Sequence, residues 1–324
     1  MNPGAPVSLA YLDASPGNVP SAYTELDFQT ALRSAGFEMR RPTSMGIPET
    51  ASHQLRRALG RVVGNLSNGR GSKLLCLMMG PAGARLVPDG IWNRCALHCW
   101  DTWPENFSVW DSLFTRFRTQ IAFFTSRQAR DRFQSRFPGM KCCWMPDGSN
   151  PGAHHPEKLL ADRIIDVLEL GRRHHPYHAA IAPQLLRDGR KHLFESPPGK
   201  VVFPRREEML NGLADSKIVV CFPSSVTLPD RAAIETITPR YFEAMASGSI
   251  VVGHCPTDLI ELFGYNPVIE ADLENPAAQI ARILSSIEEH QPLIRRNLEK
   301  VYENTWLHRA RAAKLILEAA DPPA

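Results

Sequence analysis

The chain has 324 residues, of which 43% are hydrophobic and 22% are charged, and this composition excludes a disordered or fibrous protein. Its length suits two domains of roughly 150 residues each. The formal net charge of +3 is too small to indicate a nucleic-acid partner, and no apolar run approaches the roughly 20 residues that span a bilayer.

Short apolar runs alternate with amphipathic stretches through the first half of the chain. Helices are predicted at 23–35, which ends at Gly36, and at 127–137, which Ser126 caps. Fully apolar strands that alternate with helices are typical of a parallel sheet covered on both faces. The buried strands that we predict here are 7–12, 73–79, 95–99, 121–124 and 141–145.

The pattern restarts after 146–156, a stretch rich in Pro, Gly, Asn and His that we interpret as a linker. The predicted fold is α/β, with two doubly wound domains facing each other across a cleft. The domains are expected at 1–150 and 151–305, with a closing helix at 306–324. The second half contains predicted strands at 164–170, 201–203, 218–222 and 250–253, and predicted helices at 176–188, 206–214, 239–247, 275–290 and 291–320.

The strongest signal for chemistry lies between residues 234 and 253. Glu235 and Glu243 have seven residues between them, and a carboxylate accepts paired hydrogen bonds from vicinal hydroxyls such as those of a ribose or a hexose. The alternative is that both are solvated carboxylates. Further donors lie between them at the start of a predicted helix, where backbone N–H groups favour a phosphate: Thr236, Thr238 and Arg240.

This stretch, Glu-x7-Glu followed by Ala-Met-Ala-Ser-Gly and an apolar strand, resembles the donor site of family 4-type retaining glycosyltransferases, the glycosyl transferases group 1. Similar segments are 124–126, 144–150, 167–173 and 304–310. The resemblance implies a GT-B fold whose closing helices cross back to the first domain. It also implies transfer of a sugar from a nucleotide-diphosphate sugar to an acceptor hydroxyl, with retention and without metal or cofactor.

The resemblance also implies roles for individual residues. Glu243 is expected to hold the donor ribose, and Glu235 to lie near the donor sugar hydroxyls. Arg172 and Arg173 match the position of a basic pair that neutralises the diphosphate, which a guanidinium fork suits. The lysine that usually follows is absent from its place, and Arg190 and Lys191 are the nearest substitutes. The alternative for the arginine pair is a basic surface.

In the first half, His98 and Asp101 follow a predicted strand at the point where ligands bind in open α/β sheets. By resemblance His98 is expected to reach the donor sugar, and either residue would be the base if transfer inverts. The alternative for His98 is a core histidine. Trp100 and Trp103 suit either sugar stacking or the core. Gly17 belongs to a loop that resembles the one over the donor phosphate.

Other functions with the same fold stay open from sequence. A nucleotide-sugar epimerase or a sugar phosphorylase would act on a different set of substrates. A sugar-binding relative without turnover would bind a sugar and convert no substrate. A dehydrogenase is excluded because no Gly-x-Gly-x-x-Gly follows a predicted strand. The acceptor is expected to be a carbohydrate, a lipid-linked sugar or a small molecule. Residues 52–63 are amphipathic, as an ordinary surface helix or a peripheral membrane contact would be.

The cysteines indicate a reducing compartment. They are odd in number and mostly lie within apolar runs, which is typical of reduced, buried thiols. Cys95 and Cys99 flank His98, but no second ligand pair occurs at zinc-like spacing, so no metal site is predicted. Residues 1–6 lack a basic start and an apolar core, so a cytoplasmic location is expected. The seven cysteines are Cys76, Cys95, Cys99, Cys142, Cys143, Cys221 and Cys255.

Overall fold

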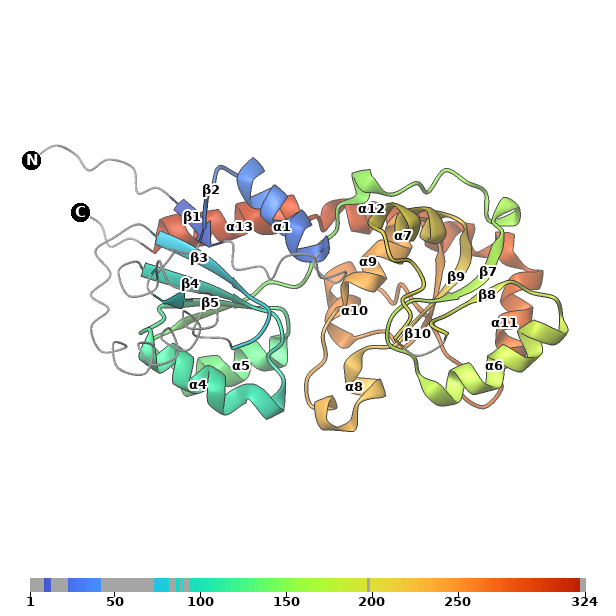
Figure 1. Cartoon of the computed structure of the whole chain (residues 1–324), viewed down its shortest axis with the longest axis horizontal. Coiled ribbons are helices and arrows are strands. Elements are labelled where there is room, and N and C mark those ends of the chain that lie inside the picture. The colour runs from blue at the N-terminus through green and yellow to red at the C-terminus, as the bar shows by residue number, and fades with distance from the viewer. Residues whose placement is uncertain are drawn as a thin grey trace, which may run out of the picture. The chain divides into compact units, whose positions relative to one another are not determined.

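The computed structural model describes residues 9–12, 23–41, 73–81, 86–87, 89, 94–196 and 199–320 (Figure 1). The chain divides into two compact units. Unit 1 comprises Met1–Pro146 and Leu307–Ala324, and unit 2 comprises Asp147–Trp306. Each unit is built on a parallel sheet with helices on both faces, so the predicted α/β fold with two doubly wound domains is confirmed.

In unit 1 the described strands form one parallel sheet in the order β2-β1-β3-β4-β5-β6. β2 lies on one side of β1 in the sheet, and β3 to β6 follow one another on its other side. Because crossovers between parallel strands are right-handed, such a reversal sends the connecting helices to opposite faces. The strands are β1 (Leu9–Leu12), β2 (Glu38–Arg40), β3 (Lys73–Met78), β4 (Arg94–Cys99), β5 (Ile121–Phe124) and β6 (Lys141–Trp144).

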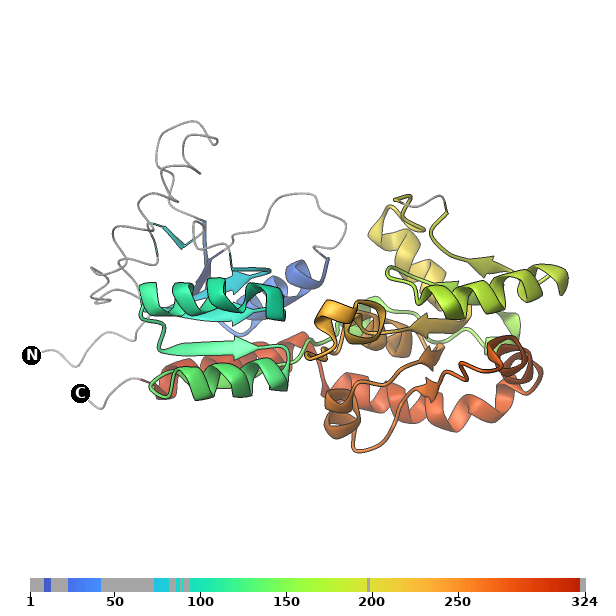
Figure 2. The same ribbon diagram turned by 90° about the horizontal axis from the view of Figure 1, so that it is seen from below.

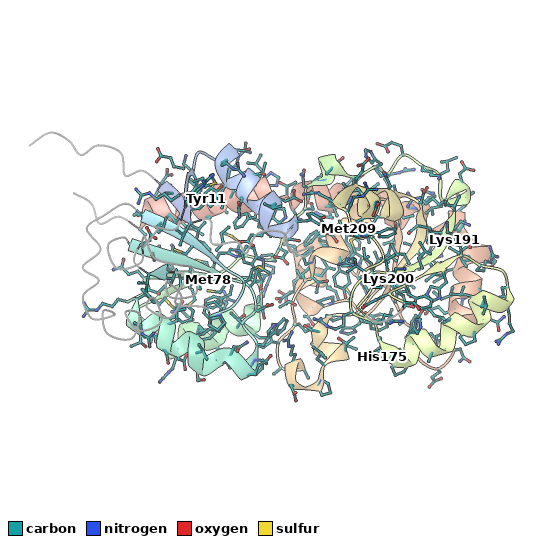
Figure 3. The ribbon with its side chains drawn as sticks, in the orientation of Figure 1. Tyr11, Met78, His175, Lys191, Lys200 and Met209 are labelled. Carbon is teal, nitrogen blue, oxygen red and sulfur yellow. The ribbon has the colours of Figure 1, made fainter. Side chains whose placement is uncertain are left out.

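Figures 1 and 2 show α1 and α13 on one face of this sheet and α4 and α5 on the other. Lys314 of α13 donates to the carbonyl of Ala35 at 3.1 Å, so the last helix packs with unit 1. Tyr11 and Met78, labelled in Figure 3, are buried in the sheet. Ser126 caps α5 by accepting from the Ala129 N–H, as predicted. The helices are α1 (Tyr23–Ser34), α4 (Phe107–Arg116), α5 (Arg127–Arg136) and α13 (Trp306–Ala319).

In unit 2 the described strands form a second parallel sheet in the order β11-β10-β9-β7-β8. The connection through α6 runs from β7 to β8, whereas α9 and α10 lead in the opposite direction, which places α6 and α9 on opposite faces. The strands are β7 (Ile165–Glu169), β8 (His192–Leu193), β9 (Ser216–Cys221), β10 (Ile250–Gly253) and β11 (Ile269–Glu270).

Helices α6 and α11 pack together on one face of the second sheet, and α9 packs with α12. Val167, Val220 and Val252 point into the α6 side of the core, together with Ile181 and Ile280. The helices are α6 (His175–Arg187), α7 (Arg206–Ala214), α8 (Ser224–Thr227), α9 (Pro239–Ala246), α10 (Thr257–Phe263), α11 (Pro276–Ser285) and α12 (Gln291–Glu303). In the described part of the chain, no helix combines the length and apolar composition needed to cross a membrane.

One predicted strand is wrong. Residues 201–203 form no strand, and the second sheet instead contains two short strands that were not predicted, β8 and β11. Because β8 is an edge strand of two residues, His192 and Leu193, it is too short to carry a period-2 pattern that sequence could reveal. The predicted state of the cysteines is confirmed, since all seven are free and all except the half-buried Cys143 are buried.

Arg163 holds the end of α9 in place. Its Nη2 donates at 2.9 Å to the carbonyl of Ser247, the C-cap residue of α9, and its Nη1 donates at 2.8 Å to the carbonyl of Ser216. Its Nε donates to the carbonyl of Lys158 at 3.2 Å. The side chain is buried, and burial lowers the pKa of the guanidinium to about 10. One buried cation therefore ties three separate segments of unit 2 together.

Replacing Arg163 with methionine is expected to lower the free energy of unfolding of unit 2 by about 3 kcal/mol, because two buried carbonyls and one partly buried carbonyl lose a charged donor. Urea unfolding followed by circular dichroism measures this loss. The matched control is Arg187→Met, an exposed arginine of α6, which is expected to change stability by less than about 0.5 kcal/mol. Equal losses for both variants would show that Arg163 contributes no more than a surface arginine.

Candidate functional site

The candidate site lies where the parallel strands of unit 2 end. Arg240 of α9 donates through Nη1 to the carbonyl of Leu170, directly after β7, at 2.5 Å. Tyr241, the next residue of α9, donates to the carbonyl of His254, directly after β10, at 2.5 Å. The start of α9 therefore joins the carboxyl ends of two strands, and the carboxyl edge of an open parallel sheet is where ligands bind.

Glu243 is held at this edge by an ion pair. Its Oε2 lies 3.1 Å from Nε of Arg240, one turn earlier in α9, and the two side chains are 18% and 26% exposed. Gly171 lies against the guanidinium: a Cβ on this residue would make an ordinary contact of 3.5 Å with Nη1 of Arg240, whereas the φ of +85° favours glycine. Glu243 is therefore a positioned, partly buried carboxylate.

Glu235 lies at the end of β10. Its Oε2 accepts a hydrogen bond from the backbone N–H of Thr257 at 3.0 Å, and its Oε1 lies 3.3 Å from Nε2 of His254. The other ring nitrogen of His254 lies 3.4 Å from Glu270. The imidazole thus stands between two carboxylates. Sequence reasoning missed His254, because it is 19 positions from Glu235 and only the tertiary fold brings the two together.

The hydroxyl residues between the two glutamates differ in exposure. Thr236 is buried and Thr238 is half-buried. Thr238 is the N-cap residue of α9 but makes no side-chain capping hydrogen bond, and Pro239 is the first helical residue, as predicted. A proline at this position removes an N–H that the helix would leave unpaired in any case.

The structure separates the two arginines that follow β7. Arg172 is exposed, whereas Arg173 is half-buried. The guanidinium carbon of Arg173 lies 5.3 Å from the ring centre of Phe194, and its Nη1 lies 3.3 Å from Nε2 of His178. Arg173 is therefore held by its surroundings at the end of β7.

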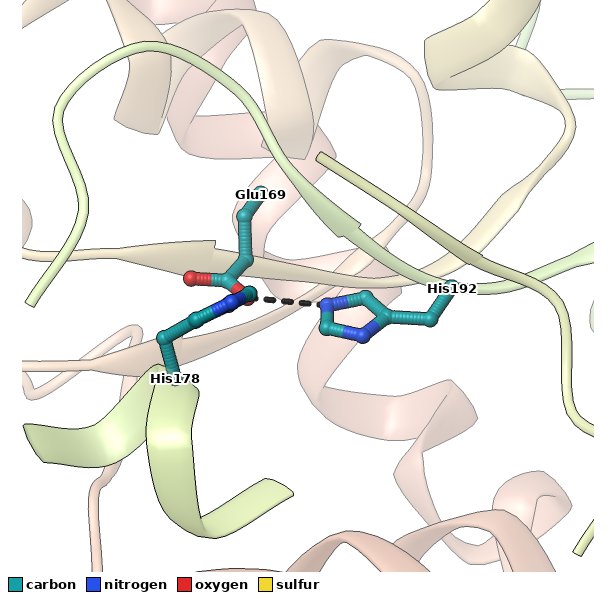
Figure 4. A group of neighbouring side chains, drawn as sticks. All are labelled: Glu169, His178 and His192. Carbon is teal, nitrogen blue, oxygen red and sulfur yellow. Dashed lines mark hydrogen bonds and ion pairs between the residues drawn. The ribbon is translucent and has the colours of Figure 1, made fainter. Parts of the chain in front are cut away.

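His178, which contacts Arg173, belongs to a cluster of three side chains (Figure 4). Oε1 of Glu169 lies 2.6 Å from Nδ1 of His178 and 2.8 Å from Nε2 of His192. Two imidazoles and a carboxylate are metal-ligand types, and the three ligand atoms lie within 4.8 Å of one another. Sequence reasoning did not single out these residues, although the His-His-Pro-Tyr-His run at 174–178 was an available signal.

Hydrogen bonding accounts for this cluster. A guanidinium only donates, so Nε2 of His178 must accept from Arg173, and the proton of a neutral ring then sits on Nδ1, facing Glu169. Glu169 is buried, which raises its pKa, but hydrogen bonds from His192 and His178 outweigh burial and leave the pKa below its usual value. A metal ion at Nδ1 would displace that proton and break the hydrogen bonds that link Arg173, His178 and Glu169, so we assign the three side chains a hydrogen-bonding role.

The unit 1 candidates lie in different surroundings. His98 is fully buried, with its ring 5.0 Å from Phe28 and 4.2 Å from Trp100, and neither ring nitrogen has a partner among the described residues. Burial lowers the pKa of His98 to about 3. Asp101 is exposed and accepts from Nε1 of Trp103 at 3.1 Å. Gly17 and the amphipathic stretch 52–63 lie outside the described residues.

Replacing His98 with leucine is expected to make unit 1 less sensitive to acid. The unfolded chain binds a proton at His98 below its ordinary pKa of 6.5, whereas the folded chain does not until about pH 3. Stability is therefore lost as pH falls through this window, by about 1.4 kcal/mol per unit, or about 2 kcal/mol between pH 6.5 and pH 5. The leucine variant lacks this loss.

Urea unfolding at pH 7 and pH 5 measures the difference. Tryptophan fluorescence reports mainly on unit 1, because Trp92, Trp100, Trp103, Trp110 and Trp144 lie in it and only Trp306 lies elsewhere. If wild type and His98→Leu lost the same stability between the two pH values, the buried ring would not be neutral as the structure implies.

Comparisons with known proteins test the family resemblance and the fold. Residues 199–316 match a family model described as glycosyl transferase-like, which confirms the resemblance over most of unit 2, including both glutamates. No match was found among curated proteins. Two solved structures are similar over nearly the whole chain. One is HepE of Anabaena in complex with UDP and glucose, with a TM-score of 0.59 and 12% identity over 97% of this chain and 100% of that one. The other is sucrose-phosphate synthase of Thermosynechococcus elongatus, with a TM-score of 0.63 and 13% identity over 97% of this chain and 100% of that one.

A third similar structure is the trehalose-6-phosphate protein of E. coli bound with UDP-2-fluoro glucose. Its TM-score is 0.64 at 13% identity, over 98% of this chain and 100% of that one. These likenesses establish the fold. The chain has the fold of the GT-B glycosyltransferases, with two Rossmann-like domains, as the resemblance predicted.

Proposed function

We propose that this protein is a glycosyltransferase that moves a sugar from a nucleoside-diphosphate sugar to an acceptor hydroxyl. The observation that carries the proposal is the position of Glu235 and Glu243. Both carboxylates are held at the carboxyl edge of the unit 2 sheet, Glu243 through Arg240 at the end of β7 and Glu235 beside His254 at the end of β10. They also lie within the segment that matches the glycosyl transferase-like model.

The nucleotide part of the donor fits the side chains at this edge. We assign Glu243 to the ribose hydroxyls, since a carboxylate accepts two such hydrogen bonds. Thr238, the N-cap residue, makes no side-chain capping hydrogen bond and lies at the start of α9, where an anion is favoured, and Thr236 and Arg240 complete this group. Arg173 is assigned to the diphosphate, and Arg172 to a supporting positive charge. The similar structures that contain UDP and UDP-glucose make UDP the first nucleotide to test.

The proposed reaction retains the configuration of the sugar. The bond between the anomeric carbon and the phosphate oxygen breaks, the acceptor oxygen bonds to the same face, and its proton passes to the departing phosphate. The protein then positions the substrates and stabilises the charge of the leaving group, and neither a metal nor another cofactor enters the step. Glu235 is assigned to the donor sugar hydroxyls. His98 and Asp101 stay proposals for the unit 1 side, and a ring with a pKa near 3 is a poor base at neutral pH.

The test of the proposal has two steps. A thermal-shift screen against UDP, ADP, GDP and their glucose derivatives identifies the nucleotide, and a ligand at a hundredfold excess over its dissociation constant stabilises the folded protein by about 2.7 kcal/mol. Labelled donor is then incubated with carbohydrate, lipid-linked and small-molecule acceptors. Glycosylated acceptor supports transfer, whereas an epimerised donor without acceptor supports an epimerase. Nucleotide binding with no product supports a sugar-binding protein.

A further inference from the structure

The side chain of Arg173 is fixed from two sides. The ring of His178 lies at hydrogen-bond distance from Nη1, 3.3 Å, and the ring of Phe194 lies beside the guanidinium at 5.3 Å. A free arginine side chain has many rotamers and loses this freedom when it binds a ligand. Both contacts therefore lower the entropy cost of binding an anion, because the side chain is ordered before the ligand arrives.

His178 is itself fixed by a buried carboxylate. Its Nδ1 lies 2.6 Å from Oε1 of Glu169, and the same oxygen lies 2.8 Å from Nε2 of His192. The Glu169 side chain is 3% exposed, that of His192 6% and that of His178 18%. Their hydrogen bonds are thus shielded from water, and buried hydrogen bonds are stronger and better oriented than exposed ones. The three residues come from β7, α6 and β8, so regular secondary structure holds each of them.

The hydrogen bonds of this group run in one direction, from Arg173 as donor through His178 to Glu169 as acceptor. Glu169 accepts from Nδ1–H of His178, which leaves Nε2 with a lone pair that accepts from Arg173. This arrangement uses one corner of the guanidinium fork and leaves its other N–H groups for a ligand. A histidine that accepts a hydrogen bond orients a cation without cancelling its charge, unlike the ion pair of Arg240 with Glu243.

We infer that Glu169 and His178 are positioning residues that hold the guanidinium of Arg173 for the phosphate groups of a nucleoside diphosphate. The inference rests on the proposed function for the identity of the ligand. It assigns the phosphate contact to Arg173 and gives the buried Glu169–His178 pair a purpose that packing alone does not require.

Affinity for UDP, or for the diphosphate that the thermal-shift screen selects, tests the inference by titration calorimetry. His178→Leu removes the acceptor and is expected to weaken diphosphate binding about tenfold, with the affinity for the nucleoside unchanged. His178→Gln keeps one donor and one acceptor and is expected to recover part of the loss. The control is His175→Leu, an exposed histidine on the same helix (labelled in Figure 3), which is expected to bind as wild type does.

A double-mutant cycle separates positioning from general damage. If His178 acts through Arg173, Arg173→Ala combined with His178→Leu binds the diphosphate no more weakly than Arg173→Ala alone. Additive losses, or a loss of nucleoside affinity equal to that of the diphosphate, would overturn the inference. If wild type binds the diphosphate and His178→Leu binds it equally well, only this inference fails. If wild type binds no nucleoside diphosphate, the proposed function fails with it.

Discussion

Replacing Glu243 with alanine is expected to reduce sugar transfer by about a hundredfold while the protein stays folded. The carboxylate is assigned to the donor ribose, and a hydrogen bond to a charged group contributes about 1.5–3 kcal/mol, or about 10- to 150-fold in binding. The same change also removes one of the two partners that Arg240 has among the described residues, since its Nε is 3.1 Å from Glu243 and its Nη1 donates to the carbonyl of Leu170. Initial rates with labelled donor, measured at several donor concentrations, separate the loss of donor affinity from a loss of turnover.

Two further variants make this prediction specific. Glu243→Gln keeps the shape of the side chain and one acceptor oxygen but loses the charge, so an intermediate loss of transfer is expected. Glu299→Ala removes an exposed carboxylate of α12 and is expected to transfer as wild type does. Because Glu243 is 18% exposed, the alanine variant should lose no more than about 1 kcal/mol of stability. A folded Glu243→Ala protein with wild-type transfer would refute the assignment of the site.

Replacing Gly253 with alanine is expected to destabilise unit 2 by more than about 4 kcal/mol, enough to prevent its folding. Gly253 is the last residue of β10 and pairs with Cys221 of β9. An added Cβ would lie 1.7 Å from the carbonyl oxygen of Cys221 and 2.6 Å from its carbonyl carbon. Both atoms belong to the backbone of the central sheet, so relief of the clash requires the two strands to separate.

The clash would also damage the candidate site, because the hydroxyl of Tyr241 donates to the carbonyl of His254, the residue after Gly253. The same hydroxyl lies 3.4 Å from the carbonyl oxygen of Cys221. Soluble yield, thermal unfolding and limited proteolysis of the variant measure the effect. The control is Gly152→Ala in the same unit, where the nearest atom to an added Cβ is a side-chain oxygen of Asn150 at 4.0 Å. A Gly253→Ala protein as stable as this control would mean that the two strands pair differently from the structure.

The sequence by itself determined the architecture and predicted the two acidic residues of the candidate site. Strands such as 121–124 are wholly apolar because both faces of a parallel sheet are covered, and this pattern can be read locally. The spacing of Glu235 and Glu243 and the proline that begins α9 are equally local, since one loop and one helical segment carry all of them. Local patterns of this kind can be recognised in the sequence without knowledge of the remaining fold.

Only the tertiary structure decided which side chains meet. His192 and Glu169 are 23 positions apart and meet because β8 pairs with β7. His254 and Glu235 are 19 positions apart and meet where the loop before α9 lies beside the end of β10. The sequence left His98 open between a core residue and a ligand-binding one, and the structure buries its ring beside Phe28. The two-residue strand β8 shows the same limit, because hydrogen bonds to β7 define it and its own residues carry no pattern. Pairing between distant segments depends on sheet order and register, which no local window of sequence contains.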